Sequence, residues 1–297
     1  MFDIIVPVYR VNPDWVSECL ESIKAQTYPY WRCIIVNGTP DDWEGYDDLL
    51  HAISDYCLED SRFWHTTQTG SGVSQARNQG VSTGHHPYLA FLDADDTWYP
   101  DHLTFMMEAI LDAPSHTAVW ANAADIEVPI PSDKTGEIHT IKSVAGYYET
   151  YKEYNVAHHY YYMMGHPPFT SNVVTTRKDF EAVDGFDESL QMWEDTECWM
   201  RILQLGKRFV QLDSIGGFHR LGEHQTTRFG SQSSAYTTGE SKDVLIKRFQ
   251  DQIIRIENRH PLPTMDDKPD RVSTQYWEMV IQQSVGVNRS QVIGAIK

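Results

Sequence analysis

The chain has 297 residues, enough for one large domain or two small ones. Hydrophobic residues make up 41% of it, which is typical of a folded protein with a sizeable core. Its 24 basic residues against 42 acidic ones give a net charge of −18, which argues against non-specific binding to nucleic acid or to an anionic membrane surface. A phosphorylated substrate would therefore need a metal ion or a local basic group to neutralise its charge.

The N-terminal sequence and the cysteines predict a cytoplasmic protein. "MFDIIVPVYR" lacks the basic region and long apolar core of a signal peptide, and no stretch approaches the roughly 18 apolar residues of a membrane span. The cysteines lie far apart without the paired spacing of a metal site, so we expect reduced, largely buried thiols. They are Cys19, Cys33, Cys57 and Cys198.

Predicted strands and helices alternate over the first hundred residues. Runs of apolar residues predict strands at 3–9, 31–38, 62–67 and 88–92. Asn12 is a suitable helix cap with Pro13 at the first helical position. The apolar stripe of that helix consists of Val16, Cys19, Leu20 and Ile23. Further helices are predicted at 46–58 and within 70–80, so the order indicates an α/β domain with a mostly parallel sheet.

The second half of the chain predicts a less regular succession of elements. Helices are expected at 101–111, 177–183 and 194–205, and strands at 117–128 and 170–176. Residues 130–168 read as irregular. Within them, the rings of the aromatic tract at 146–165 could pack against the apolar faces of a ligand or form a loop packed by its own rings.

The C-terminal segment is predicted to be helical from about Ser241. Its apolar side consists of Leu245, Phe249, Ile253 and Ile256. Its charges are mixed in sign, so we expect this helix to pack on the core or on a second subunit in a homo-oligomer rather than on a membrane.

Three carboxylates, Asp93, Asp95 and Asp96, directly follow the apolar strand "YLAFL". In open α/β sheets, ligands bind beyond the carboxyl ends of the strands, where these charges would be solvated or bound to a metal. A polar turn is the other interpretation, because Asp is common in turns. The pattern of residues leaves both interpretations open.

Four motifs in order resemble the GT-A-fold, family 2 inverting glycosyltransferases. The motifs are "IIVPVYR", "GVSQARNQG", "AFLDADD" and "GFDESLQMWEDTECWMRI", and the resemblance covers about residues 3–225. It implies an α/β, GT-A-type nucleotide-binding fold with a mostly parallel mixed central sheet flanked by helices. The implied domain is 1–235, divided into a nucleotide-sugar-binding half at 1–98 and an acceptor-binding half at 99–235. A C-terminal helical extension would follow at 236–297.

The resemblance implies transfer of a sugar, of the hexosyltransferase type, from a nucleotide-sugar to a hydroxyl of a glycan or other acceptor. A nucleoside diphosphate leaves in such a reaction, and a divalent cation, Mn²⁺ or Mg²⁺, would stabilise its charge as a Lewis acid. In the DXD-type motif, Asp93 would contact the ribose, Asp95 would hold the metal and Asp96 would have a structural role. His219 would be a further metal ligand, with His224 a second histidine close by in the sequence.

The pair Glu194-Asp195 offers a general base. By resemblance, Asp195 would take the proton from the acceptor hydroxyl, and Glu194 is the next carboxylate to consider. The residue types alone favour a helix cap, because Asp is a preferred residue at a helix start. The two roles are compatible, since a helix N-terminus favours an ionised carboxylate.

The nucleotide is expected at the carboxyl ends of the first strands. The expected nucleotide-binding residues are Pro7, Val8, Tyr9, Asn37, Arg77, Asp93 and Ala94. Tyr9 would stack on the base, and Arg77 would reach the base or diphosphate unless it is a solvated helix arginine. Asn37 stands where the family usually has an acidic residue, which leaves the base identity open, with a UDP-sugar as the first choice.

Two other functions are weighed against this one. A non-catalytic carbohydrate- or nucleotide-binding protein on the same fold is supported by the missing acid at Asn37, but the intact Asp93, Asp95 and Asp195 oppose it. A sugar-phosphate nucleotidyltransferase would need a glycine-rich, basic phosphate loop after the first strand, and "VYRVNPDW" has no glycine.

Overall fold

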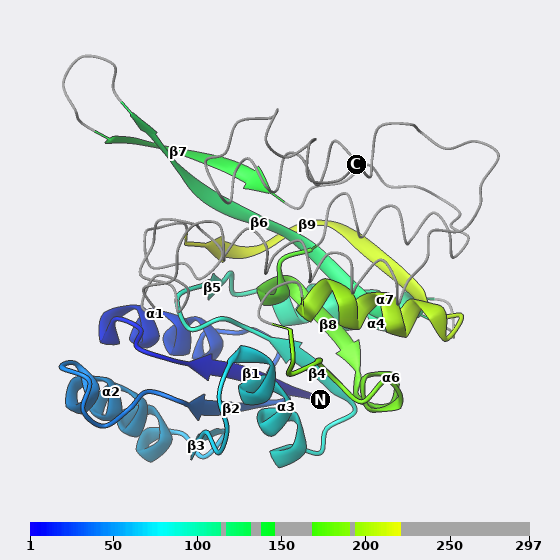
Figure 1. Cartoon of the computed structure of the whole chain (residues 1–297). Coiled ribbons are helices and arrows are strands. Elements are labelled where there is room, and N and C mark those ends of the chain that lie inside the picture. The colour runs from blue at the N-terminus through cyan, green and yellow to red at the C-terminus, as the bar shows by residue number, and fades with distance from the viewer. Residues whose placement is uncertain (114–116, 132–137, 146–167, 191–193, 221–297) are drawn as a thin grey trace, which may run out of the picture. The chain divides into compact units, whose positions relative to one another are not determined.

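The computed structural model describes residues 1–113, 117–131, 138–145, 168–190 and 194–220 (Figure 1). All of them belong to one of the two compact units into which the chain divides. Three predictions lie outside these residues: the role of the aromatic tract at 146–165, the C-terminal helix and the domain boundary at 235. All three therefore stay predictions.

A mixed sheet forms the centre of the described unit. The strands are β1 Phe2–Val8, β2 Trp31–Asn37, β3 Phe63–Thr67, β4 Tyr88–Phe91, β5 Thr97–Trp98, β6 Thr117–Pro131, β7 Ile138–Ala145, β8 Val173–Thr176 and β9 Arg208–His219. Their order is β3-β2-β1-β4-β8-β6-β9-β5, and β7 pairs with β6. The first four strands are parallel, whereas β8 runs antiparallel to both β4 and β6. The predicted α/β fold with a mixed sheet is confirmed.

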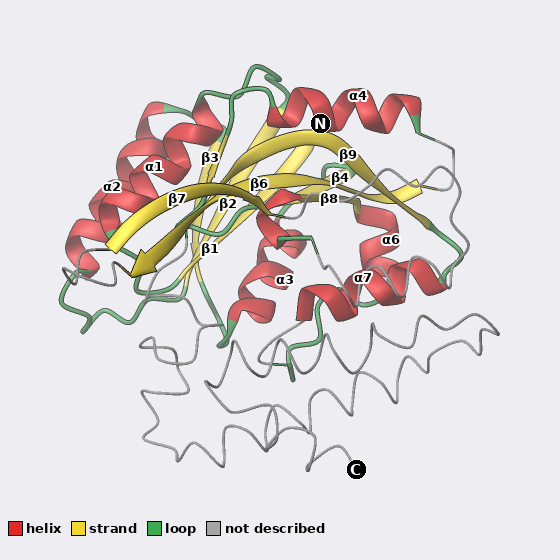
Figure 2. Ribbon diagram, turned by 90° about the horizontal axis from the view of Figure 1, so that it is seen from above, coloured by secondary structure: helices red, strands yellow, loops and turns green. Residues whose placement is uncertain are grey.

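Helices cover both faces of this sheet (Figure 2). They are α1 Pro13–Lys24, α2 Tyr46–Glu59, α3 Val73–Thr83, α4 His102–Asp112, α6 Arg177–Ala182 and α7 Glu194–Gln204, with a 3₁₀ turn η1 at Thr170–Asn172. The start of α1 is as predicted: the Asn12 side chain accepts a hydrogen bond from the Asp14 N–H, and Pro13 occupies the first turn.

Side-chain alternation in β1 assigns the helices to the two faces. Ile4 belongs to the core cluster that also contains the apolar faces of α1, α2 and α4. Ile5 points the other way, toward α3, where it packs against Gly80: a Cβ on that glycine would come within 2.6 Å of Ile5 Cγ2. Both side chains are fully buried, as expected for a central parallel strand covered on both faces.

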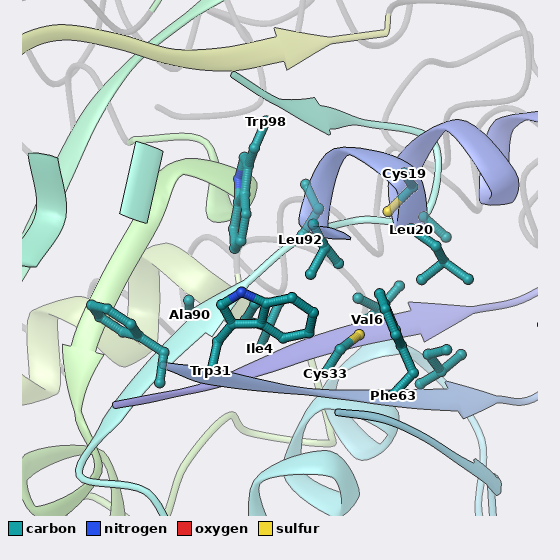
Figure 3. Close-up of a cluster of buried hydrophobic side chains, with 14 of the residues drawn as sticks. Ile4, Val6, Cys19, Leu20, Trp31, Cys33, Phe63, Ala90, Leu92 and Trp98 are labelled. Atoms are coloured by element: carbon teal, nitrogen blue, oxygen red, sulfur yellow. The ribbon is translucent and has the colours of Figure 1, made fainter. Parts of the chain in front are cut away.

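The core under α1 and α2 is built from aliphatic, sulfur-containing and aromatic side chains (Figure 3). Trp31 of β2 meets Phe63 of β3 edge to face, with ring centroids 5.3 Å apart. Cys19 and Cys33 are buried in the same cluster. None of the four cysteines forms a disulfide, as predicted. In the ranges the structure describes, no helix combines the length and apolar character needed to cross a bilayer.

Three strands were not predicted from the sequence. Residues 138–145, expected to be irregular, form β7, which pairs with β6 over eight residues. β9 escaped prediction because its pairing with β6 contains register shifts that break simple alternation. β5 has two residues and pairs with β9 at Gly217, where a Cβ would lie 2.2 Å from the Thr97 carbonyl oxygen. The strand expected at 170–176 begins at Val173, because the three residues before it form η1.

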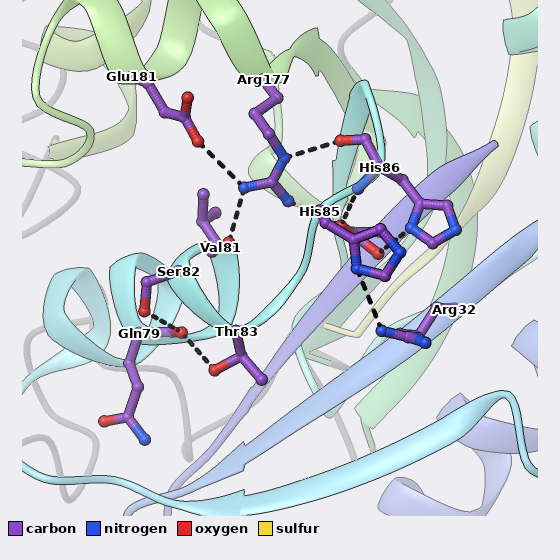
Figure 4. A network of polar contacts seen from close by, with 10 residues as sticks. Arg32, Gln79, Val81, Ser82, Thr83, His85, His86, Arg177 and Glu181 are labelled. Carbon is purple, nitrogen blue, oxygen red and sulfur yellow. Dashed lines mark hydrogen bonds and ion pairs between the residues drawn. The ribbon is translucent and has the colours of Figure 1, made fainter.

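A buried ion pair joins the beginning of β1 to the beginning of α6 (Figure 4). The Asp3 side chain has no exposed surface, and its Oδ2 accepts hydrogen bonds from Arg177 Nη2 and from the His86 N–H, both at 2.7 Å. Arg177 also donates to the carbonyl oxygens of His86 and Val81, each at 2.7 Å. The imidazole Nδ1 of His86 lies 3.0 Å from Asp3 Oδ1 without the alignment of a hydrogen bond.

Arg177→Met tests this ion pair. The substitution leaves the Asp3 carboxylate buried without its guanidinium partner, so the free energy of unfolding should fall by about 3–5 kcal/mol. Glu181→Gln is the control, because Glu181 contacts the same guanidinium through a carboxylate that is 58% exposed and should cost about 0.5 kcal/mol or less. Urea unfolding measures both variants. Equal losses would contradict the assignment of the burial cost to Asp3.

Candidate active site

The three carboxylates after β4 have different surroundings. Asp93 and Asp95 are partly exposed, whereas Asp96 is 1% exposed. The Asp96 N–H donates to the Asp93 carbonyl oxygen at 3.0 Å, which closes a turn beyond the carboxyl end of the strand. Ala94, an expected nucleotide contact, is 2% exposed inside this turn. The acidic run therefore presents two of its side chains to solvent and keeps the third inside.

Asp96, in the turn after β4, contacts the end of β9 through its carboxylate. Its Oδ1 accepts from the Arg220 N–H at 3.0 Å, and its Oδ2 lies 2.8 Å from His219 Nδ1 and accepts from the Ser171 hydroxyl. Burial raises the pKa of Asp96, and the nearby imidazole partly offsets this rise. Burial would lower the pKa of His219, but the charge of Asp96 and its hydrogen bond, together with the charges of Asp95 and Asp93, raise that pKa overall. This contact directs Nδ1 of the imidazole at Asp96.

Arg77 of α3 bridges two carboxylates that are distant in sequence. Its Nη2 donates to Asp93 Oδ1 and its Nη1 donates to Glu194 Oε1, both at 2.7 Å. The Arg77 side chain is 4% exposed, so the interpretation as a solvated helix arginine is wrong. Burial alone would lower the pKa of Arg77, but the charges of Asp93 and Glu194 raise it. The guanidinium is thus held permanently charged between the strand end and the start of α7.

The start of α7 carries the second pair of carboxylates. Glu194 is buried, and burial together with the charge of Asp195 raises its pKa to about 6, although Arg77 opposes this rise. Asp195 is partly exposed; its Oδ2 accepts from the Thr170 hydroxyl at 2.5 Å, and its Oδ1 accepts from the Thr196 N–H at 2.6 Å. Asp195 is the second residue of the helix, so it does not occupy the cap position before the first helical residue, although its Oδ1 binds the N–H of Thr196 in the first turn. Its role as a base stays a prediction.

The expected nucleotide pocket lies at the ends of β1 and β2. Pro7 and Val8 end β1, and the Tyr9 side chain beyond them is 56% exposed. The Val8 carbonyl oxygen accepts from the Gly38 N–H at 2.8 Å, which ties the two strand ends together. Asn37 is 2% exposed, and its Oδ1 accepts from the Thr39 N–H at 2.9 Å. Its carboxamide oxygen therefore shapes the turn, and contact of Asn37 with a nucleotide stays a prediction.

Three residues of this site were missed by the sequence reasoning. Thr170 and Ser171 of η1 link Asp195 to the carboxylates after β4. Arg220 contacts the Asp95 carbonyl oxygen through Nε at 3.1 Å, and its guanidinium pairs with Glu18. Isolated hydroxyl residues and one arginine have no diagnostic spacing. The polar "TSN" at the start of the strand predicted at 170–176 was the single available signal for the first two.

A divalent cation at this site would need ligands from the side chains around the acidic turn. Among the described residues, no group of three or more His, Cys, Asp and Glu side chains is arranged to hold a metal ion. Asp95 and His219 are the expected protein ligands, and His224 lies outside the described residues. One carboxylate and one imidazole leave most of the coordination to other ligands, and Mg²⁺ is commonly held by one or two carboxylates together with substrate phosphates and water. A cation here would therefore bind together with a phosphorylated ligand.

Comparison with protein families identifies the class of this chain. The family described as "Glycosyl transferase family 2" matches residues 3–165, more than half of the sequence. This region contains β1 to β4, Arg77 and the acidic turn. The chain belongs to glycosyl transferase family 2, as its motifs predicted.

Individual relatives support the family and the fold. The chain is 29% identical over 117 residues to the "Putative teichuronic acid biosynthesis glycosyltransferase TuaG" of Bacillus subtilis, covering 38% of this chain and 42% of that protein. It spans less than half the length of the curated relatives it matches, as little as 13% in one case.

Solved structures with little sequence identity share the GT-A fold. TarS of S. aureus, residues 1–349 in complex with UDP-GlcNAc, has a TM-score of 0.61 at 18% identity and covers 97% of this chain and 74% of that one. Mannosyltransferase PcManGT from Pyrobaculum calidifontis, in complex with GDP-Man and Mn²⁺, has a TM-score of 0.58 at 13% identity and covers 99% and 74%.

Ser171→Ala tests whether this hydroxyl organises the acidic turn. Ser171 accepts from the Asp93 N–H at 3.1 Å and donates to Asp96, so its removal takes the acceptor from the Asp93 N–H and one of three hydrogen-bond partners from Asp96. The free energy of unfolding should fall by about 1–3 kcal/mol, measured by urea unfolding. Ser189→Ala, at an exposed serine, should change it by less than about 0.5 kcal/mol. A variant as stable as the wild type would show that the hydroxyl does not hold the turn.

Proposed function

We propose that this chain is a metal-dependent, inverting glycosyltransferase. It would move a sugar from a nucleotide-sugar donor to a hydroxyl of a glycan or other acceptor, with Asp195 as the general base. The observation that carries the proposal is the contact of Arg77 with both Asp93 and Glu194, residues from distant parts of the sequence. This contact links the acidic turn, which we expect to bind the donor, to the start of α7, which we expect to act on the acceptor.

The surroundings of Asp195 support its proposed role as the base. Its carboxylate is partly exposed at the N-terminus of α7, and hydrogen bonds to Thr170 and Thr196 fix its orientation. A positioned carboxylate that takes the acceptor proton contributes typically ~10²–10⁴-fold to the rate. Glu194 is a poorer choice, because it is buried and its Oε1 already accepts from Arg77.

The donor would bind along the carboxyl edge of β1, β2 and β4. Tyr9 presents an exposed ring suited to stacking on a base, and Asp93 keeps one carboxylate oxygen beyond the one that Arg77 binds. Asp95 and His219 would hold Mn²⁺ or Mg²⁺, which supplies Lewis-acid stabilisation of the leaving diphosphate. UDP-sugar is the proposed donor; the complex of TarS with UDP-GlcNAc supports it, and the complex of PcManGT with GDP-Man makes GDP-sugar the alternative to test.

Asp195→Asn tests the base. Asn keeps the size of the side chain and an oxygen that accepts from the Thr196 N–H, but it cannot take a proton. The transfer rate should fall by about 10²-fold or more, while the melting temperature and the affinity for nucleoside diphosphate stay close to those of the wild type. Glu188→Gln, which removes an exposed carboxylate shortly before α7, is the matched control. Near-normal turnover of the Asn variant would remove Asp195 from the mechanism.

Asp95→Asn tests the cation. Calorimetry with UDP should show tighter binding in the presence of Mn²⁺ for the wild type, and the variant should lose most of that gain because a neutral amide is a weaker ligand for a hard cation. Asp101→Asn, at an exposed carboxylate outside the acidic turn, should keep it. Equal affinity of the wild type with and without Mn²⁺ would rule out the metal-dependent part of the proposal.

A further inference from the structure

Arg77 has the geometry of a connector between three elements. It extends from α3, contacts Asp93 in the turn after β4 and contacts Glu194 at the start of α7. The two carboxylates are 32% and 10% exposed, and the arginine side chain between them is 4% exposed. Each terminal nitrogen therefore has its own anionic partner, and the bridging contacts are shielded from water.

We propose that Arg77 is a positioning residue that couples the donor-binding carboxylate Asp93 to the acceptor-activating pair Glu194-Asp195, and that it does not bind the nucleotide itself. The inference rests on the proposed function, because it takes Asp93 as a donor contact and Asp195 as the base. It replaces the expectation that Arg77 reaches the base or the diphosphate.

The planar fork of the guanidinium explains why an arginine is needed here. The Nη1 and Nη2 donors, each 2.7 Å from an oxygen of a different carboxylate, belong to one rigid plane and so fix the relative position of both carboxylates. A lysine ammonium is a compact charge with three rotatable donors on a flexible stem and defines no such geometry. The Cζ of Arg77 also lies 5.5 Å from the centre of the Phe186 ring, which packs against Phe91 of β4 at 5.2 Å. A movement of Arg77 toward a ligand would break both ion pairs and this packing.

Charge is the second part of the coupling. The charged groups facing Glu194 are Arg77 from α3 and Asp195 on its own helix, with Asp93 on the far side of the guanidinium. Arg77 opposes the rise in the pKa of Glu194 that burial and Asp195 produce. Loss of the arginine charge would raise the pKa of Glu194 further above its ordinary value, and the carboxylate beside the base would also lose the hydrogen bond from Arg77 Nη1.

The experiment compares Arg77→Gln and Arg77→Lys in the full chain. Arg201→Gln is the matched control, because Arg201 makes an ion pair with the buried Glu197 on the same helix α7 but touches none of the site carboxylates. Three quantities are measured: the pKa of Glu194 by carboxyl ¹³C NMR, the affinity for UDP with Mn²⁺ by calorimetry, and kcat and KM of sugar transfer as functions of pH.

A positioning role predicts a split between these quantities. Arg77→Gln should raise the pKa of Glu194 by about one unit or more and lower kcat by about tenfold or more, with UDP affinity within about threefold of the wild type. Arg77→Lys should keep the pKa of Glu194 near its wild-type value and still lower kcat, because the charge remains and the fork is lost. Arg201→Gln should lower the melting temperature and leave both the pKa of Glu194 and kcat in place.

Other outcomes would overturn the inference. A loss of UDP affinity by tenfold or more at unchanged kcat would assign Arg77 to nucleotide binding. A fall in melting temperature alone, matched by Arg201→Gln, would leave it a purely structural ion pair. If the wild type transfers no sugar, the proposed function fails. The pKa of Glu194 and the UDP affinity still decide the inference then, because an unmoved pKa in Arg77→Gln means that the two carboxylates are not coupled.

Discussion

A guanidinium removed from water needs an anionic partner. Two largely buried arginines are paired with carboxylates in this way, one at the beginning and one at the end of the parallel strands. Arg177 binds Asp3 where β1 begins, and Arg77 binds Asp93 close to where β4 ends. Each arginine links the parallel first half of the sheet to an element from the second half: Arg177 belongs to α6, and Arg77 also contacts Glu194 at the start of α7. Separating either pair leaves a buried charge, which costs far more than an exposed ion pair contributes.

The antiparallel strand β8 explains why the site can form. Because β8 runs opposite to β4, its beginning lies at the edge where β4 ends, and η1 directly before it reaches the acidic turn. Ser171 of η1 then bonds to Asp93 and Asp96, while Thr170 bonds to Asp195. One reversed strand thus brings the carboxylates of the first half into contact with the helix start of the second half.

The parallel half of the fold and the positions of the site carboxylates were predictable from the sequence. β1, β2 and β4 are buried apolar runs, and the cap of α1 by Asn12 follows from local chemistry. The partnership of Arg77 with Glu194 was not predictable, because it joins residues 117 positions apart and "ARN" alone fits an exposed helix equally well. The roles of Thr170, Ser171 and β9 depend on pairings of the same long-range kind. For Asn37, the position at the end of β2 was predicted. Its burial and its hydrogen bond from the Thr39 N–H were not, because both depend on the conformation of the local turn.

Charge at this edge of the sheet gives the proposed cation its physical reason. Most positive side chains there already contact carboxylates: Arg77 contacts Asp93 and Glu194, His219 contacts Asp96, and Arg220 contacts Glu18. Arg10, exposed beyond the end of β1, adds one further positive charge. Asp95 and Asp195 add further negative charge to the same region, in a chain of net charge −18. A diphosphate approaching this edge would meet carboxylates without a compensating surplus of arginine or lysine among the described residues, so like charges would repel it. A divalent cation held by Asp95 would reverse the sign of that interaction, so the charge of this edge supports a metal ion in the proposed function.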